Sequence, residues 1–343
     1  MLKDTLRALC ALRGPSGWED EVRDYLRREA EPYADQIRIT PQGSLLVFKR
    51  GAARPAHSLL LAAHMDEVGL LVRRITDDGF LKFHFVGGVD RRVVLGKKVW
   101  VGEKGLPGIL GMKPIHLTDD KELESIPEAK HLYIDIGAAS RAEAEALVEP
   151  GDYAVFDGAL TELRNGRFRV KAIDDRFGCA VLLETLKRDL PLDTWFAFTV
   201  MEEIGSRGAY NAAFALAPEI TLVVEGTSAC DLPQAQGPEA VCRLGGGPVI
   251  PYLDNGAIYD LGLVRELIRL AEARGLPWQT KSRVAGSTDA RAFQKVARGG
   301  RVAALSAPVR YIHSPSSVAD IKDLEAVQAL LDAFLENQEV LDG

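Results

Sequence analysis

The chain has 343 residues, 47% of them hydrophobic and 27% charged, with a formal net charge of −7. This length is sufficient for two domains, or for one large domain with an insertion. The negative charge argues against nucleic acid or an anionic membrane as a partner, because either would need a basic patch. No apolar run approaches the roughly 20 residues of a membrane span. Asp4 and Arg7 fall where a signal peptide would be apolar, and four widely spaced cysteines indicate free thiols, so we expect a cytoplasmic protein.

The N-terminal segment predicts two helices followed by two strands. Leu2, Leu6 and Leu9 recur at helical spacing. Residues 16–19 match a capping box that would start a second helix ending at Arg28. Two strand-like runs follow, and the second is almost continuously apolar, which is typical of a sheet covered on both faces. These runs occupy residues 44–48 and 58–63.

From Glu67 the pattern changes to that of a small β-rich domain. Residues 68–75 and 80–86 flank Asp77-Asp78-Gly79, a strong hairpin signal. Shorter strand-like runs separated by glycines follow, with a single good helix near the end. They occupy residues 99–101, 108–110 and 133–136, with the helix at 139–148. The segment 67–163 therefore predicts an inserted small β-barrel domain.

After residue 163 helices and strands alternate again, which predicts a mainly parallel sheet covered by helices on both faces. The predicted helices are 177–188, 207–216, 261–274, 289–297 and 321–336, and the strands are 194–200, 221–224 and 302–305. The fold class is therefore α/β. We expect one discontinuous catalytic domain, residues 1–66 and 164–343, interrupted by the β-rich insertion.

Polar clusters follow several of these strands, where ligands of open α/β sheets collect. His64 and Asp66 would point to the same face of an extended chain, so that Asp66 could orient the imidazole or a neighbouring ligand. Taken alone, such a pair is more often a solvated strand end. The Asp174-Asp175 pair precedes a helix, and one of the two could act only as its N-cap. The other could bridge two cations.

The pair Glu202-Glu203 is more informative, since an apolar strand runs directly into two carboxylates. Adjacent side chains of extended backbone point in opposite directions, so one can bind a metal while the other faces a reacting water. Side-by-side carboxylates at a buried strand end are unfavourable unless cations or protons compensate them. Glu225 and His313 each follow a predicted strand and, considered singly, carry little information.

Together these clusters supply the nitrogen and oxygen ligands that two zinc-like ions prefer. Two metals with a bridging carboxylate and a water between them suit amide hydrolysis. The rival chemistries fit less well: the chain has no G-x-S-x-G nucleophile elbow, no cysteine in an activated setting and no phosphate-binding glycine motif. The residues alone therefore predict a metal-dependent hydrolase.

The order of these motifs resembles that of the tetrahedral (TET-type) dinuclear metallo-aminopeptidases, the glutamyl/leucyl aminopeptidase family that sometimes carries an endoglucanase label. The matching stretches are AHMDEVG at 63–69, KAIDDRFG at 171–178, EEIGSRG at 202–208, GGGP at 245–248, GSTDA at 286–290 and RYIHSP at 310–315. They span most of the chain, and their combination is highly specific. The resemblance implies a zinc-exopeptidase-like fold, and it identifies the β-rich insertion as a dimerisation domain.

The resemblance also implies a role for each site residue. His64, Asp174 and Glu225 would bind one divalent ion, and Asp174, Glu203 and His313 the other, with zinc or cobalt expected. Glu202 would be the general base, and Asp66 would orient the site. Three departures stand out: Glu225 replaces the frequent aspartate, Met201 replaces a frequent glutamine, and serines follow His313 where an acidic residue is common.

The expected substrates are peptides with a free N-terminus, and the expected assembly is a homo-oligomer, a dodecamer built from dimers. Two other functions remain open. One is hydrolysis of small N-acyl compounds by an amidohydrolase with similar metal chemistry. The other is a non-catalytic, metal-stabilised scaffold, although a scaffold would need no base such as Glu202. Cellulose cleavage is discounted, because it normally uses two carboxylates without a histidine-bearing metal cluster.

Overall fold

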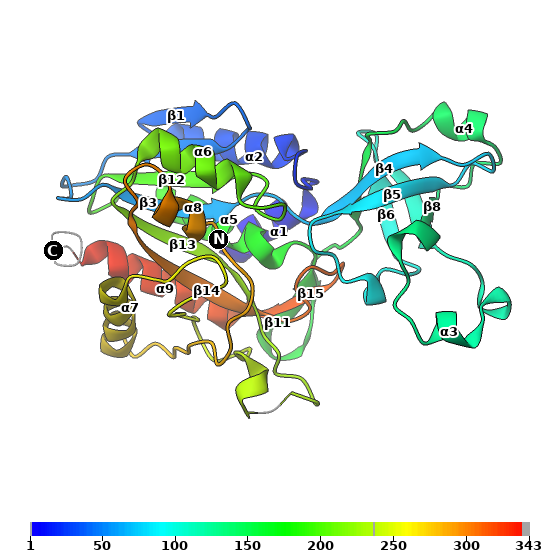
Figure 1. The fold of residues 1–343 in the computed structure, drawn as a ribbon. Coiled ribbons are helices and arrows are strands. Elements are labelled where there is room, and N and C mark those ends of the chain that lie inside the picture. The colour runs from blue at the N-terminus through cyan, green and yellow to red at the C-terminus, as the bar shows by residue number, and fades with distance from the viewer. Residues whose placement is uncertain (1, 236, 338–343) are drawn as a thin grey trace.

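A computed structural model describes residues 2–235 and 237–337 and places them in two bodies, a large α/β domain and a smaller barrel that projects from one side (Figure 1). The large domain is built on a six-stranded sheet of order β1-β2-β12-β3-β13-β14. Strands β12, β3, β13 and β14 run parallel, while β1 and β2 are antiparallel at one edge. The strands are β1 Gln36–Ile39, β2 Leu45–Lys49, β3 Leu59–His64, β12 Thr194–Thr199, β13 Ile220–Ser228 and β14 Arg301–Val309.

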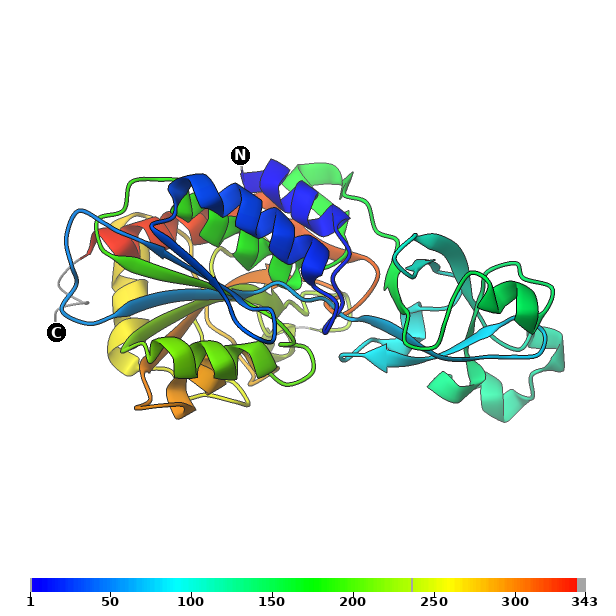
Figure 2. The same cartoon turned by 90° about the horizontal axis from the view of Figure 1, so that it is seen from above.

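Helices cover both faces of this sheet, as Figure 2 shows: α1, α2, α5 and α9 lie on one face, and α6 and α8 on the other. The helices are α1 Leu2–Ala11, α2 Asp20–Ala30, α5 Ile173–Leu186, α6 Arg207–Leu216, α7 Leu261–Ala273, α8 Ala290–Lys295 and α9 Ile321–Glu336. All six residues of β3 are buried, as expected for a strand covered on both faces. The predicted α/β fold with a mainly parallel sheet is confirmed.

The inserted barrel has its own hydrophobic core. Its closed order is β4-β5-β8-β7-β6-β9, and all the paired strands are antiparallel. Its elements are β4 Gly69–Ile75, β5 Leu81–Val86, β6 Lys98–Val101, β7 Leu106–Gly111, α3 Asp120–Leu123, β8 Tyr133–Asp135, α4 Arg141–Glu145 and β9 Tyr153–Phe156. The core side chains Leu70, Phe83, Val99 and Ile134 are each almost fully buried. Closure leaves no strand edge unpaired, which explains how short strands form a stable unit.

Five short strands of the structure are missing from the sequence prediction, among them β9 of the barrel. Another is β1, whose four residues are mostly exposed, so that its short polar–apolar alternation is only a weak strand signal. Three others form a small antiparallel sheet of order β10-β11-β15, with β10 Thr161–Glu162, β11 Arg167–Val170 and β15 Ser317–Asp320. This sheet joins distant parts of the chain, and local sequence patterns carry no information about such pairings.

The predicted capping box at residues 16–19 is wrong. Helix α2 begins at Asp20, and its N-cap residue Glu19 makes no side-chain capping bond. Ser16 instead donates its hydroxyl hydrogen bond to Asp66, 50 residues further along the chain. Ser16 therefore bonds to a residue distant in sequence instead of capping the adjacent helix, because its side chain is buried against the site described below.

A buried ionic cluster lies where the two bodies meet. Lys171 Nζ lies 2.6 and 2.8 Å from the two carboxylate oxygens of Glu67, and Arg176 NH2 lies 3.2 Å from Glu67 Oε1. All three side chains are buried. Glu67 therefore packs with the large domain, as does β10, which pairs with β11. Within the described residues, no helix combines the length and apolarity needed to cross a lipid bilayer.

Candidate metal centre

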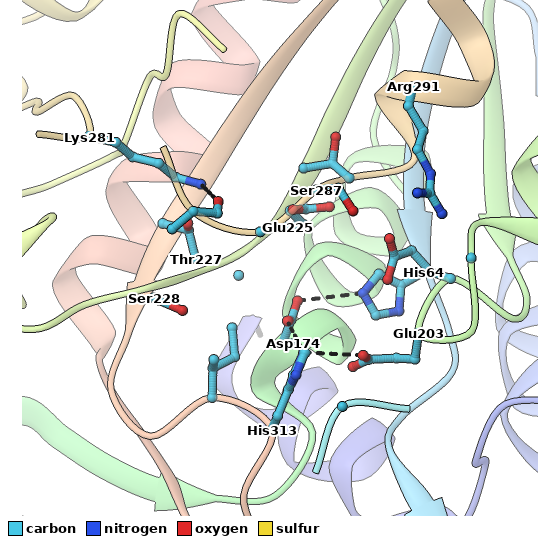
Figure 3. Close-up of a pocket in the computed structure, with 18 residues that line it drawn as sticks. His64, Asp174, Glu203, Glu225, Thr227, Ser228, Lys281, Ser287, Arg291 and His313 are labelled. Carbon is cyan, nitrogen blue, oxygen red and sulfur yellow. Dashed lines mark hydrogen bonds and ion pairs between the residues drawn. The ribbon is translucent and has the colours of Figure 1, made fainter. Parts of the chain in front are cut away.

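The polar clusters predicted from the sequence meet at the carboxyl ends of the parallel strands (Figure 3). They line a pocket of about 370 Å³ that contains His64, Asp174, Glu202, Glu203, Glu225 and His313. His64 is the last residue of β3, and Glu202-Glu203 follows β12. Glu225 lies near the end of β13, and His313 lies in the loop after β14. The parallel arrangement of the strands thus converts residues distant in sequence into neighbours.

Asp174 lies between the two histidines. Its Oδ1 is 3.5 Å from His64 Nε2, and its Oδ2 is 3.6 Å from His313 Nε2. The two oxygens of one carboxylate therefore face two different imidazoles. Burial opposes ionisation of Asp174, but the neighbouring His313 and His64 imidazoles outweigh it and lower the pKa of this carboxyl. Asp174 is therefore present as a carboxylate.

Glu203 lies on the same side as His313, whose Nε2 is 3.1 Å from Glu203 Oε2. The ligand atoms of His64, Asp174 and Glu203 all lie within 4.8 Å of one another, close enough to share a metal site. Burial raises the pKa of Glu203 to about 7, against the lowering effect of His313. The barrel supports this side of the site: the turn after β5 places Gly88 directly against the His313 ring. A β-carbon at residue 88 would lie 3.2 Å from His313 Nδ1, closer than almost all real contacts of that kind.

Asp66 connects the two strand ends behind the pocket and is fully buried. Its Oδ1 is 3.3 Å from His64 Nδ1 and accepts the backbone N–H of Glu202. Its Oδ2 accepts the Ser16 hydroxyl at 2.6 Å and the backbone N–H of Glu203. These contacts with His64, Ser16 and Glu202 outweigh burial and lower the pKa of Asp66. The carboxylate fixes both the imidazole and the Glu202-Glu203 turn, which is the geometry expected of an orienting residue.

The two aspartates of the 174–175 pair have different roles. Asp175 Oδ1 accepts the backbone N–H of Gly178 at 2.9 Å, which is N-cap geometry, and its Oδ2 accepts the backbone N–H of His64. Regular helical geometry in α5 begins only after Asp175. The N-cap interpretation therefore applies to Asp175, and Asp174 is left to face the pocket.

Glu202 is partly buried in the same pocket, and burial raises its pKa well above the usual range. Its Oε1 accepts the Ser206 hydroxyl at 3.3 Å. Asp289 lies nearby, fully buried, and accepts the hydroxyl of Thr199. A raised pKa suits a group that must take up and release a proton near neutral pH.

Glu225 lines the same pocket and is only 7% exposed. Burial raises its pKa well above the usual range, and the neighbouring Asp174 and Glu202 add to this effect. It stands outside the compact group formed by His64, Asp174 and Glu203. Its longer side chain, relative to aspartate, can still reach inward from β13.

The donor set fits divalent metal ions. Asp174 Oδ1 is buried and receives no hydrogen bond from a described residue. Four carboxylates share one pocket, and burial raises the pKa of three of them: Glu202, Glu203 and Glu225. Carboxylates packed in this way repel one another unless protons or cations intervene. Imidazole nitrogens combined with carboxylate oxygens are the ligands that zinc and cobalt accept.

Sequence reasoning missed the residues that support this centre. Ser16 was assigned to a helix cap, and Ser206 and Asp289 were not singled out. Glu19 accepts the backbone N–H of Met201, directly before the glutamate pair, yet it lies 182 positions earlier. The motifs EEIGSRG and GSTDA contain Ser206 and Asp289, so their presence in the motifs was the available signal.

With this geometry in hand, the chain can be compared with known proteins. The M42 glutamyl aminopeptidase family profile matches residues 43–330. The chain belongs to the M42 aminopeptidase family. A putative aminopeptidase of Acetivibrio thermocellus is 36% identical over 96% of this chain and 98% of its own. An aminopeptidase from the archaeon Desulfurococcus kamchatkensis has the same fold with a TM-score of 0.93, 34% identity, and coverage of 99% of this chain and 96% of its own.

The M42 assignment confirms both the predicted resemblance and the predicted enzyme class. The Pyrococcus horikoshii TET1 peptidase, described as assembling into a tetrahedron or a large octahedral shell, is 36% identical with a TM-score of 0.86. That match covers 98% of this chain and 99% of the TET1 chain. M42 proteins are hydrolases, so this chain is a hydrolase of the aminopeptidase type.

Proposed function

We propose that this M42 protein is a dinuclear-metal aminopeptidase that removes N-terminal residues from peptides. The observation that carries the proposal is the position of Asp174, whose two oxygens face His64 and His313 separately. A carboxylate placed in this way can bridge two ions. His64 and Glu225 would complete the first ion's ligands together with Asp174. Glu203 and His313 would complete the second ion's.

The chemistry follows from the protein groups around that pair. Two divalent ions would acidify a water and polarise the scissile carbonyl. Glu202 takes the proton of the attacking water and returns it to the departing amine. The Ser206 hydroxyl holds one oxygen of Glu202, and Asp66 holds the backbone N–H that precedes its side chain. Asp66 also sets the direction of the His64 ring.

The free N-terminus of the substrate is the feature that distinguishes this function from amidohydrolase activity on N-acyl compounds. We expect leucyl and glutamyl peptides to be cleaved and their N-acetylated forms to be resistant, measured as amine release by mass spectrometry with zinc or cobalt present. Equal rates on free and acetylated peptides would favour the amidohydrolase. Metal binding with no cleavage of either set would favour the scaffold.

We also propose that the barrel mediates assembly into a dodecamer built from dimers. Four large aliphatic side chains of its 115–126 segment are exposed, Ile115 by 74%. The other three are Leu117, Leu123 and Ile126. Apolar side chains gathered on one exposed segment are typical of a contact surface. The related TET1 peptidase assembles into closed shells, which supports the same architecture here.

Zinc or cobalt as the physiological metal, and the cytoplasm as the location, remain predictions from the sequence. Elemental analysis of protein purified without added metal checks the first. Fractionation of the source cells checks the second.

A further inference from the structure

Apart from the proposed metal ligands and base, the charged side chains that line the pocket among the described residues are both cationic. They are Lys281 and Arg291. Figure 3 shows them on opposite sides of the pocket: Lys281 lies near Thr227 and Ser228, whereas Arg291 reaches down from α8 toward the His64 side. Lys281 Nζ donates to the Ala285 carbonyl at 3.2 Å. Neither cation forms an ion pair with a carboxylate of the described residues.

Arg291 is held in place through one atom of its guanidinium. Its Nε donates to the Ser206 hydroxyl at 3.0 Å, and that hydroxyl donates to Glu202 at 3.3 Å. The terminal nitrogens have no hydrogen-bond acceptor within the part of the chain that the structure describes. The aliphatic stem packs against Gly256, where a β-carbon would lie 3.0 Å from two of its atoms. Arg291 therefore has a fixed stem and two terminal nitrogens that are free to donate hydrogen bonds.

The charge balance of the pocket favours an anion at these donors. The lining carboxylates are Asp174, Glu202, Glu203 and Glu225. Two divalent ions would offset these four charges, which leaves the two basic side chains without compensation. An arginine head presents paired N–H donors that match the two oxygens of a carboxylate. The expected ligand group is therefore a carboxylate of the substrate.

The position of Arg291 indicates which part of the substrate carries that carboxylate. Glu202 returns a proton to the departing amine in the proposed mechanism, so groups beside Glu202 face the leaving residue. Arg291 is separated from Glu202 by the single hydroxyl of Ser206. Lys281, on the opposite wall, has no such link to the base.

We propose that Arg291 is a specificity-determining residue that binds a carboxylate on the leaving residue, so that dipeptides and peptides with an acidic second residue are preferred substrates. The inference rests on the proposed aminopeptidase function. The carboxylate has two possible sources, the C-terminus of a dipeptide or an acidic side chain at the second position. Both place an anion one residue beyond the scissile bond.

Two substrate pairs separate these sources. Leu-Ala is compared with Leu-Ala-amide for the C-terminal carboxylate, and Leu-Glu-amide with Leu-Gln-amide for the side chain. Each pair differs only at the carboxylate, so a general effect of a variant on Glu202 cancels in the ratio of kcat/KM values. We expect the carboxylate member of at least one pair to be favoured roughly tenfold, mainly through KM, the size typical of one hydrogen-bonded charge pair.

The variants are Arg291→Gln and Arg291→Lys, with Arg298→Gln as the matched control. Arg298 is an exposed arginine just beyond α8 and does not line this pocket. We expect Arg291→Gln to bring the ratio close to one, Arg291→Lys to retain part of it, and Arg298→Gln to leave it at the wild-type value. A wild-type ratio near one for both pairs, or an unchanged ratio in Arg291→Gln, would overturn the proposal.

A binding measurement separates this inference from the catalytic one. Analogues of Leu-Ala and Leu-Ala-amide with a reduced, uncleavable peptide bond are titrated calorimetrically into metal-loaded wild-type and Arg291→Gln protein. Tighter wild-type binding of the carboxylate analogue, lost in the variant, supports the role of Arg291 even if no peptide is hydrolysed. Hydrolysis of all four peptides with a ratio near one for both pairs, together with equal affinity for both analogues, would reject Arg291 and leave the aminopeptidase function intact.

Discussion

At the residue scale, the proposed site gives different roles to two adjacent carboxylates, those of Glu202 and Glu203. Glu203 faces His313 at 3.1 Å, whereas Glu202 accepts the Ser206 hydroxyl on the other wall. Both backbone N–H groups are held by one carboxylate, that of Asp66. The turn is thereby fixed, and the two side chains diverge. In the proposed mechanism, this divergence would allow Glu203 to bind metal while Glu202 transfers protons.

The first prediction concerns Glu202→Gln, which preserves the shape of the side chain but removes its proton acceptor. We expect both metals to be retained and kcat to fall about 10²–10⁴-fold, the usual effect of losing a general base. Metal content by elemental analysis and kcat on a leucyl peptide are measured together. Loss of metal along with activity would mean that the roles of Glu202 and Glu203 are reversed.

At the element scale, a buried ionic cluster of the large domain lies where the chain passes into the barrel. Glu67 lies between β3 and β4, Lys171 lies between β11 and α5, and Arg176 lies on α5. Their cluster is buried, so each charge depends on the others for compensation. Gly88 from the barrel loop also contacts the His313 ring. The barrel therefore contacts the proposed metal site without supplying any of the proposed ligands.

The second prediction is that Glu67→Gln strongly destabilises the fold, because it leaves Lys171 and Arg176 buried without a countercharge. Removing one partner of a buried ion pair typically costs about 3–5 kcal/mol. The guanidinium midpoint should fall accordingly, with fluorescence and circular dichroism as probes. Glu128→Gln, which breaks an exposed pair with Lys130, is the control and should leave the midpoint unchanged. Equal midpoints for the two variants would contradict the proposed role of the cluster.

At the scale of the whole molecule, the proposed function depends on both the metals and the assembly. The proposed ligand residues lie on β3 and β13, in the loops after β12 and β14, and at the start of α5. Metal binding therefore couples to the packing of the whole domain. The barrel projects away from this domain and exposes the aliphatic segment 115–126 (Figure 1). These two features lead to separate predictions.

The third prediction is that exhaustive chelation abolishes peptide hydrolysis and that added zinc or cobalt restores it. Two ions per chain should bind on restoration, measured by elemental analysis of the desalted protein. The ligand set of carboxylates and imidazoles provides the physical reason. Full activity of demonstrably metal-free protein would falsify the metal mechanism.

The fourth prediction is a large homo-oligomer, observed by light scattering at micromolar concentration with metal present. We propose the barrel as a separate domain, and excision of residues 69–156 behind a short linker should give a much smaller species. Glu67 and β10 are kept in that variant because they contact the large domain. An intact protein with the mass of one chain, 37.4 kDa, would refute the assembly while leaving the chemistry unaffected.

The α/β class, the barrel insertion and the polar clusters could be predicted from the sequence because each depends on a pattern in neighbouring residues of the chain. The apolar run of β3 and the Asp77-Asp78-Gly79 hairpin are examples, since burial and turn geometry depend on adjacent residues. The position of Ser16 could not be predicted in this way. Its local spacing matches a helix cap, but its partner Asp66 reaches it only after the chain has folded. Arg291 is similar, because its link to Glu202 through Ser206 joins α8 to α6. Side-chain chemistry is a property of the sequence, whereas contact between distant side chains depends on how the helices and strands pack.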